Sequence, residues 1–185
     1  MSDSLRRRLR ALPDFPADLP SFDPATAPAD PVALFLDWFE HALDAGVPQP
    51  HAFSLATATA TATGLVSSRM LILKNLEPAS SGATAGVDFG VWQFASTRTS
   101  RKGRELTANP HAALNFYWAA LGRQVRVVGE VSVLSAEASA ADWEERPGAD
   151  GQANPQWQLY ALHPTEVEFW QASGDRHHIR HRYVL

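Results

Sequence analysis

The sequence predicts a mainly β domain with helices (α+β), in which a small β-barrel carries its helices on the outside. Two patterns predict this class. From residue 51 onward, short apolar or alternating segments recur between turn-forming residues, as in antiparallel β proteins. Three helical patterns precede or interrupt them, and each begins at a residue suited to cap a helix: Asp30, Ser100 and Ser135.

The composition supports one globular domain and excludes several classes of protein. The 185 residues are 45% hydrophobic and 19% charged, which is typical of a folded domain. There is no cysteine, so disulfides and thiolate metal sites are excluded and a cytoplasmic location is expected. No apolar run has the length of a membrane span, and none resembles a signal peptide. The formal charge of −4 disfavours nucleic acid as a partner.

Residues 1–30 are expected to form an extended, partly mobile arm ahead of a single domain over residues 31–185. Five prolines in this arm disfavour regular structure beyond a short helix around Leu5–Leu12. Its basic run, Arg6–Arg8, is interpreted as solvated.

The first long helix is predicted between the cap Asp30 and Gly46, with Pro31 at its first position. Its core-facing residues are expected to be Leu34, Phe35, Trp38, Phe39, Ala42 and Leu43.

The remaining elements follow from alternation, apolar runs and turn residues. Strands are predicted at His51–Thr59, Ser68–Lys74, Val87–Phe94, His111–Trp118, Arg123–Leu134, Trp157–Leu162 and Glu166–Gln171. Helices are predicted at Arg101–Ala108 and from Ser135 to about Glu145. Turns or loops are expected at Ala62–Gly64, Pro78–Gly86, Leu121–Gly122 and Gly148–Pro155, and the tail Asp175–Tyr183 is rich in cations and imidazoles.

Two basic stretches point to an anion. The strand Ser68–Lys74 has a cation near each end, and Ser100–Gly103 adds two more where a helix begins. Helix N-termini favour anions, so the two stretches predict a site for a phosphorylated ligand. The alternative is an ordinary strand and a solvated basic turn. Strict alternation places Arg69 and Lys74 on opposite faces of their strand, unless it twists, bulges or ends at the site.

Five sequence blocks then occur in a fixed order between residues 31 and 183. They are Ala45-Gly46-Val47-Pro48; Ser67–Lys74; Ser100–Leu106 with Asn109-Pro110; Phe116-Tyr117-Trp118 with Arg123-Gln124-Val125; and Glu168–Gln171 followed by Arg176, His178 and Arg180. In this order they resemble the pyridoxamine 5′-phosphate oxidase family of flavoproteins.

The resemblance implies a split β-barrel that binds FMN at the interface of a homodimer. One subunit would bind the phosphate and the ring through Arg69, Met70, Leu71, Lys74, Ser96, Ser100, Arg101 and Lys102. The second copy would reach the same cofactor with Gln124, Trp170 and Arg180. Arginine pairs with phosphate in a bidentate way, a glutamine can hydrogen-bond the polar edge of the ring, and tryptophan covers it.

The resemblance also implies a substrate site formed by Lys74, Arg146, Arg176 and His178. This sequence departs from the family around that site. Asp142 stands where the family has a tyrosine, Asp150 replaces a serine, and Ala95-Ser96 replaces a Tyr-Thr pair. The loop at 148–155 also replaces a longer segment.

Several residues have simpler interpretations. His177, His178 and His181 could suggest a metal site, but neighbouring arginines disfavour a cation there, and no metal is expected. Trp170 could be ordinary core. Arg146 could complement a helix dipole.

Two classes of function remain open at this point. The first is an FMN-dependent oxidase resembling pyridoxamine/pyridoxine 5′-phosphate oxidase, acting in pyridoxal phosphate biosynthesis or on another heterocycle such as a phenazine precursor. In either case a small heterocyclic amine or alcohol gives a hydride to FMN, oxygen reoxidises the flavin, and no catalytic proton-transfer residue is assigned. The second is a flavin-binding protein without oxidase activity on vitamin B6 phosphates.

Overall fold

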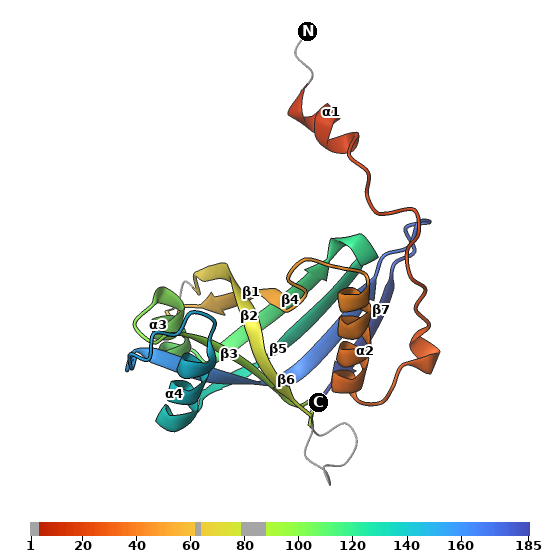
Figure 1. Cartoon of the computed structure of the whole chain (residues 1–185). Coiled ribbons are helices and arrows are strands. Elements are labelled where there is room, and N and C mark those ends of the chain that lie inside the picture. Colours follow the sequence, from red (N-terminus) through yellow and green to blue (C-terminus); the bar gives the residue numbers. More distant parts are fainter. Residues whose placement is uncertain (1–3, 62–63, 79–87) are drawn as a thin grey trace.

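The computed structural model describes residues 4–61, 64–78 and 88–185. One antiparallel sheet, in the order β3-β2-β1-β4-β5-β6-β7, is also paired between β3 and β6 (Figure 1). This pairing closes strands β1 to β6 into a barrel, and β7 extends the sheet beyond β6. The predicted barrel with helices outside it is confirmed.

The elements follow the predicted order closely. The strands are β1 (Ala52–Ala58), β2 (Val66–Glu77), β3 (Val91–Thr97), β4 (His111–Trp118), β5 (Arg123–Val133), β6 (Trp157–Gln171) and β7 (Ile179–Val184). The α-helices are α1 (Leu5–Arg10), α2 (Pro31–Asp44), α3 (Arg101–Ala108) and α4 (Ala136–Glu145), with short 3-10 turns at Pro24–Thr26 and Ala119–Leu121. Asp30, Ser100 and Ser135 cap α2, α3 and α4, as predicted.

One long strand, β6, both closes the barrel by pairing with β3 and carries the additional strand β7. The sequence predicted two strands, at 157–162 and 166–171, because His163-Pro164-Thr165 interrupts the apolar pattern; this was wrong. The chain runs straight through, because its first half pairs with β3 and its second half with β7. The neighbouring β5 shifts register between Val128 and Gly129. A Cβ at Gly129 would lie 2.0 Å from the carbonyl oxygen of His163, so glycine is required there.

Helix α2 contributes aromatic side chains to the core. Phe35 lies 4.6 Å from Trp92 and 5.1 Å from Phe116, and Trp38 lies 5.2 Å from Phe169, measured between ring centroids. The prediction that Leu43 faces the core was wrong, since it is exposed. Nine residues separate it from Leu34, which places it about 180° around the helix.

Other boundaries also differ from the prediction: β2, for example, extends beyond the predicted 68–74 at both ends. β3 begins at Val91, because Asp88 accepts the N–H of Gly90 in a turn just before it, and Gly90 has a φ of +74°. The tail at 175–183, for which the sequence predicted no strand, ends in strand β7. Residues 62–63 of the turn predicted at 62–64 and most of the loop predicted at 78–86 lie outside the described residues. Gly64, which is described, has a φ of +54° and donates its N–H to the Thr61 carbonyl, consistent with a turn.

The N-terminal arm has two parts. α1 stands away from the barrel (Figure 1). The following segment returns to it, where Phe22 packs 5.1 Å from Trp38 and the Pro28 carbonyl accepts the Tyr183 hydroxyl at 2.6 Å. Among the described residues, no helix is long and apolar enough to cross a membrane.

Candidate functional site

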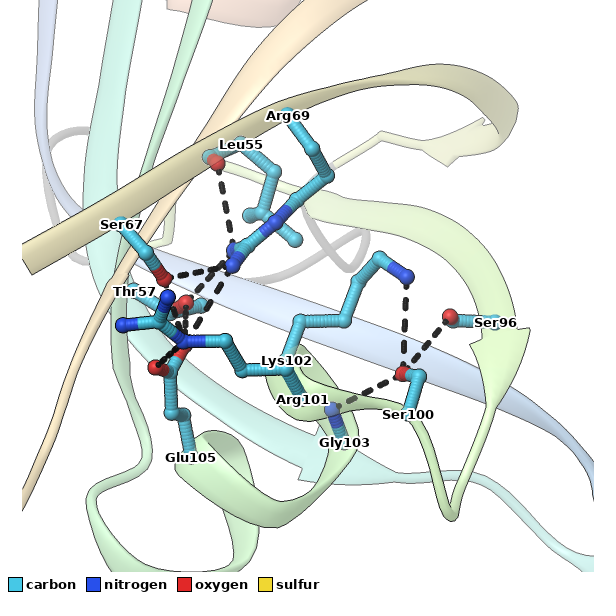
Figure 2. Close-up of polar contacts among 10 residues, drawn as sticks. All are labelled: Leu55, Thr57, Ser67, Arg69, Ser96, Ser100, Arg101, Lys102, Gly103 and Glu105. Atoms are coloured by element: carbon cyan, nitrogen blue, oxygen red, sulfur yellow. Dashed lines mark hydrogen bonds and ion pairs between the residues drawn. The ribbon is translucent and has the colours of Figure 1, made fainter.

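The start of α3 carries a cluster of polar side chains joined by hydrogen bonds. Ser100 Oγ accepts the Gly103 N–H at 3.2 Å and lies 3.4 Å from both Ser96 Oγ and Lys102 Nζ (Figure 2). Gly103 permits this arrangement, because a Cβ there would lie 2.2 Å from the Arg98 carbonyl oxygen. The cap and the close approach together fix Lys102 beside the end of β3.

A buried carboxylate, Glu105, joins α3 to the barrel strands. Its Oε2 accepts the hydroxyls of Thr57 at 2.5 Å and Ser67 at 2.8 Å, and lies 3.3 Å from Arg69 Nη2. Its Oε1 accepts Arg101 Nε at 2.8 Å. The hydrogen bond from Thr57, followed by those from Arg101 and Ser67, outweighs burial and lowers the pKa of Glu105 to about 2. Glu105 is therefore ionised at neutral pH and holds both arginines in place.

The two arginines use their donors differently. Arg69 gives its terminal nitrogens to the chain: Nη1 to the Leu55 carbonyl and Thr57 Oγ1, and Nη2 to Ser67 Oγ and Glu105. Within the described part of the chain, Arg101 is anchored only through Nε, and its side chain is 61% exposed. Its terminal fork is therefore the better placed of the two to pair with an external phosphate.

The charges of this cluster favour an anion. Arg69, Arg101 and Lys102 bring three positive charges and Glu105 one negative, which leaves an excess of two. Burial, and then the charge of Arg69, lower the pKa of Lys102 from its ordinary value. A bound anion would relieve this repulsion. A phosphate group, which carries about −1.5 to −2 at neutral pH, fits the excess.

The depressed pKa of Glu105 makes folding stability depend on acid. Its contribution is present above about pH 4.5, the ordinary value, and is lost as the pH falls toward the folded pKa of about 2. We expect Glu105→Gln to lower the free energy of unfolding at pH 7 by about 1.5–3 kcal/mol. The gap to wild type should shrink steadily between pH 4.5 and 2, as thermal melts followed by circular dichroism would show. Glu130→Gln, at an exposed position on β5, is the control, and a constant gap would contradict the assignment.

Lys74 does not join this cluster. The register of β2 against β3 shifts between Leu73 and Asn75, so Lys74 lies at a bulge. It lines a cavity with Met70 and Ile72, whereas Arg69 bonds to residues at the end of β1 and to α3. As strict alternation of side chains predicts, the two cations of this strand point to different sites: Arg69 to the α3 cluster and Lys74 to the cavity. Leu71 packs partly against the core between them.

The cavity beside Lys74 has a volume of about 370 Å³ and also contains Arg146 and Trp157. Lys74 Nζ lies 3.2 Å from Asp142 Oδ1, so the sequence was right to expect position 142 near Lys74. The other predicted carboxylate, Asp150, accepts the Gln152 N–H in the loop after α4. Neither carboxylate is among the residues that line the cavity, but Asp142 reaches it through Lys74.

The residues assigned to the second copy lie together on another face. Gln124 is opposite Trp170 across β5 and β6, and Trp170 is opposite Arg180 across β6 and β7. With His178 they line a cavity of about 290 Å³. Phe15 of the arm packs on Trp170 and His178 at centroid distances of 5.8 and 5.5 Å.

The tail cations and histidines have separate partners. Arg176 pairs with Asp14 of the arm at 2.7 Å, and His177 lies 3.4 Å from Asp175. His181 packs against Tyr183 instead.

Sequence reasoning missed Glu105, Thr57 and Ser67 as parts of the cluster. The spacing of Arg101 and Glu105, four residues apart on one helix, was an available signal for the first. Thr57 could be found only from the pairing of β1 with β2, where it lies opposite Ser67. The contact of Phe15 with Trp170 had no signal in the sequence, since it depends on how the arm is routed.

Comparison with known proteins shows which family this chain resembles. Residues 39–171 match the family model described as pyridoxamine 5′-phosphate oxidase. A pyridoxine/pyridoxamine 5′-phosphate oxidase of Herminiimonas arsenicoxydans is 34% identical over 91% of this chain and 88% of its own. One of Salinibacter ruber is 36% identical over 83% and 82%.

Solved structures agree on the fold. The crystal structure of PhzG from Burkholderia lata 383, in complex with tetrahydrophenazine-1-carboxylic acid, matches with a TM-score of 0.75 and 28% identity over 91% of this chain and 93% of that one. A pyridoxamine 5′-phosphate oxidase-related, FMN binding protein of Nostoc punctiforme, 14% identical, matches with a TM-score of 0.57 over 82% and 96%, and supports the fold alone. With the family model covering most of the barrel and relatives similar over nearly the whole chain, this protein belongs to the pyridoxamine 5′-phosphate oxidase family.

Proposed function

We propose that this protein is an FMN-dependent oxidase of a small heterocyclic amine or alcohol. The observation that carries the proposal is the cluster at the start of α3, where Arg69 and Arg101 contact one buried carboxylate, Lys102 lies beside them at Ser100, and two positive charges remain uncompensated. A donor set of this kind fits the phosphate of FMN. Family membership supports the same cofactor.

Each part of the cluster has a distinct role in this proposal. Arg101 and Lys102 pair with the phosphate, and Ser96 and Ser100 donate hydroxyl hydrogen bonds beside it. Arg69 lies behind them and contributes charge, while Glu105 fixes both arginines. FMN, when bound, supplies the redox chemistry, accepting a hydride from the substrate and passing electrons to oxygen. The residues of the chain bind and orient the reactants.

The proposal includes a homodimer with shared cofactor sites. Gln124, Trp170 and Arg180 line a cavity, and among the described residues that line it there is none of the α3 cluster, so the two predicted sets do not share this cavity. A second copy of the chain can supply the missing set, and twofold dimers are the commonest oligomers. The outer side of β2 offers apolar surface for such contact, since Val66 is 71% and Met70 64% exposed.

A second candidate function rests on the similarity to PhzG, whose structure holds a tricyclic carboxylic acid. On this reading the protein oxidises a phenazine-type precursor instead of pyridoxine or pyridoxamine 5′-phosphate. The cofactor, the cluster and the dimer remain the same.

The test is spectroscopic and then kinetic. Protein purified and loaded with FMN should show a protein-bound flavin spectrum, and light scattering at micromolar concentration should give the mass of two chains. Oxygen consumption is then followed with pyridoxine 5′-phosphate and with partly reduced phenazine carboxylates. Failure to retain FMN contradicts the proposal, and a monomer that binds FMN tightly contradicts the shared site. Bound flavin without turnover of any of these compounds would favour a flavin-binding role.

A further inference from the structure

The cavity beside Lys74 has an unusual balance of charge. Met70, Ile72 and Trp157 give it apolar walls, and Lys74 and Arg146 are the cations that line it. A site for a doubly charged phosphate needs both cations available to the ligand. Of these two cations, Lys74 is already paired within the chain and Arg146 is available.

Lys74 is already neutralised by the chain. Its Nζ lies 3.2 Å from Asp142 Oδ1, and both side chains are largely buried, with 18% and 14% exposed. The second oxygen of Asp142 accepts the indole N–H of Trp157 at 2.7 Å. Two contacts therefore hold the carboxylate against Lys74. Because the pair is shielded from water, Asp142 also repels any further anion more strongly than a surface carboxylate would.

Arg146 is the available cation. Its guanidinium carbon lies 3.4 Å from the centroid of Trp143, which fixes the plane of the group at the end of α4. Its Nε is buried and has no hydrogen-bond partner among the residues that the structure describes. A buried donor without an acceptor is costly, so a ligand oxygen at this position would be favoured.

The charge count leaves one positive charge: Lys74 and Arg146 contribute two, and Asp142 removes one. Arg176, which the family resemblance assigns to the substrate site, is itself paired with Asp14 at 2.7 Å. Both pairs involve carboxylates of this chain and cations that the family resemblance assigns to substrate binding.

Resting on the proposed oxidase function, we propose that this cavity takes a flat heterocycle bearing a single carboxylate, not a phosphate ester, and that Asp142 determines this choice. The carboxylate pairs with the Arg146 guanidinium, whose fork matches it in geometry and charge. The ring packs on Met70, Ile72 and Trp157. A phosphate ester would bring up to two charges against one available cation, and at Lys74 it would compete with Asp142, which lies 3.2 Å from that ammonium group.

The test measures ligand binding by calorimetry, on protein with and without FMN. The probes are quinoline-2-carboxylate, uncharged quinoline, and 4-deoxypyridoxine 5′-phosphate, which has no amine or alcohol at its 4-position to oxidise. Wild type should bind the carboxylate at least about tenfold more tightly than the phosphate. Asp142→Asn should tighten phosphate binding about tenfold and change carboxylate binding less than threefold. Arg146→Gln should weaken the carboxylate about tenfold or more and leave quinoline unchanged.

Glu144→Gln is the matched control, because it removes a negative charge from the same helix, whereas among the described residues it is Asp142 that pairs with Lys74. It should leave the ratio of the two affinities unchanged. Phosphate binding equal to or tighter than carboxylate binding in wild type would overturn the proposal, as would an unaltered ratio in Asp142→Asn, or binding of neither probe. The flavin spectrum of the same samples separates this result from the proposed function: a chain that cannot hold FMN refutes the oxidase, whereas the affinity ratio judges the cavity alone.

Discussion

Arg101→Ala is expected to weaken FMN binding by about 30- to 1,000-fold while changing riboflavin binding less than about threefold. Riboflavin lacks the phosphate, so it cannot report the loss of a phosphate partner. The reason for choosing Arg101 is geometric. Glu105 holds its Nε at 2.8 Å and leaves the terminal fork to the ligand, whereas the terminal nitrogens of Arg69 are bonded within the chain. This range of affinity corresponds to about 2–4 kcal/mol, within the usual cost of removing one partner of a charged pair at a binding site.

Quenching of flavin fluorescence, titrated with both flavins, measures this difference. Arg104→Ala is the control, because Arg104 lies on the same helix and donates to the Thr99 carbonyl instead of facing the cluster. It removes an equal charge, so it corrects for the long-range effect of net charge, which salt would also screen. Equal FMN affinity in Arg101→Ala and Arg104→Ala would remove the phosphate assignment.

Local patterns were enough to predict most of the barrel. The caps Asp30, Ser100 and Ser135 place three helix starts, because capping depends only on a side chain and the backbone two or three residues later. β6 was mispredicted because its continuity depends on partners far away in sequence, β3 and β7. Pro164 would end an isolated strand. Here it lies opposite Gly129, where β5 shifts register, and the strand continues past it.

The candidate site shows the same division. Ser100, Arg101 and Lys102 belong to one turn of helix, and the sequence places them together. The sequence left open whether Arg69 or Lys74 joins them. The answer is Arg69, and it depends on whether the alternation of side chains holds through the bulge in β2. Asp142 was suspected near Lys74 from the family resemblance, but its bond to the Trp157 indole requires α4 to pack on β6. Pairings between distant elements carry the information that local patterns lack.

Gly103→Ala provides a sharp test of how the cluster is built, because two physical effects predict opposite results. Helix propensity alone favours alanine over glycine in α3 by about 1 kcal/mol. The structure places the new Cβ 2.2 Å from the Arg98 carbonyl oxygen and 2.7 Å from its carbonyl carbon. These are backbone atoms and cannot rotate away, so the start of α3 must move.

We therefore expect Gly103→Ala to lower the free energy of unfolding by about 3 kcal/mol, at the upper end of the usual cost of overpacking, and the melting temperature by about 6–12 °C. FMN affinity should fall with it, since Arg101 and Lys102 lie on the displaced turn. Gly174→Ala is the control, because a Cβ there meets nothing within 4 Å and the melting temperature should hold. An unchanged or higher melting temperature in Gly103→Ala would mean that helix propensity outweighs the contact with Arg98, and that the close packing of α3 on the β3 end does not position the cations.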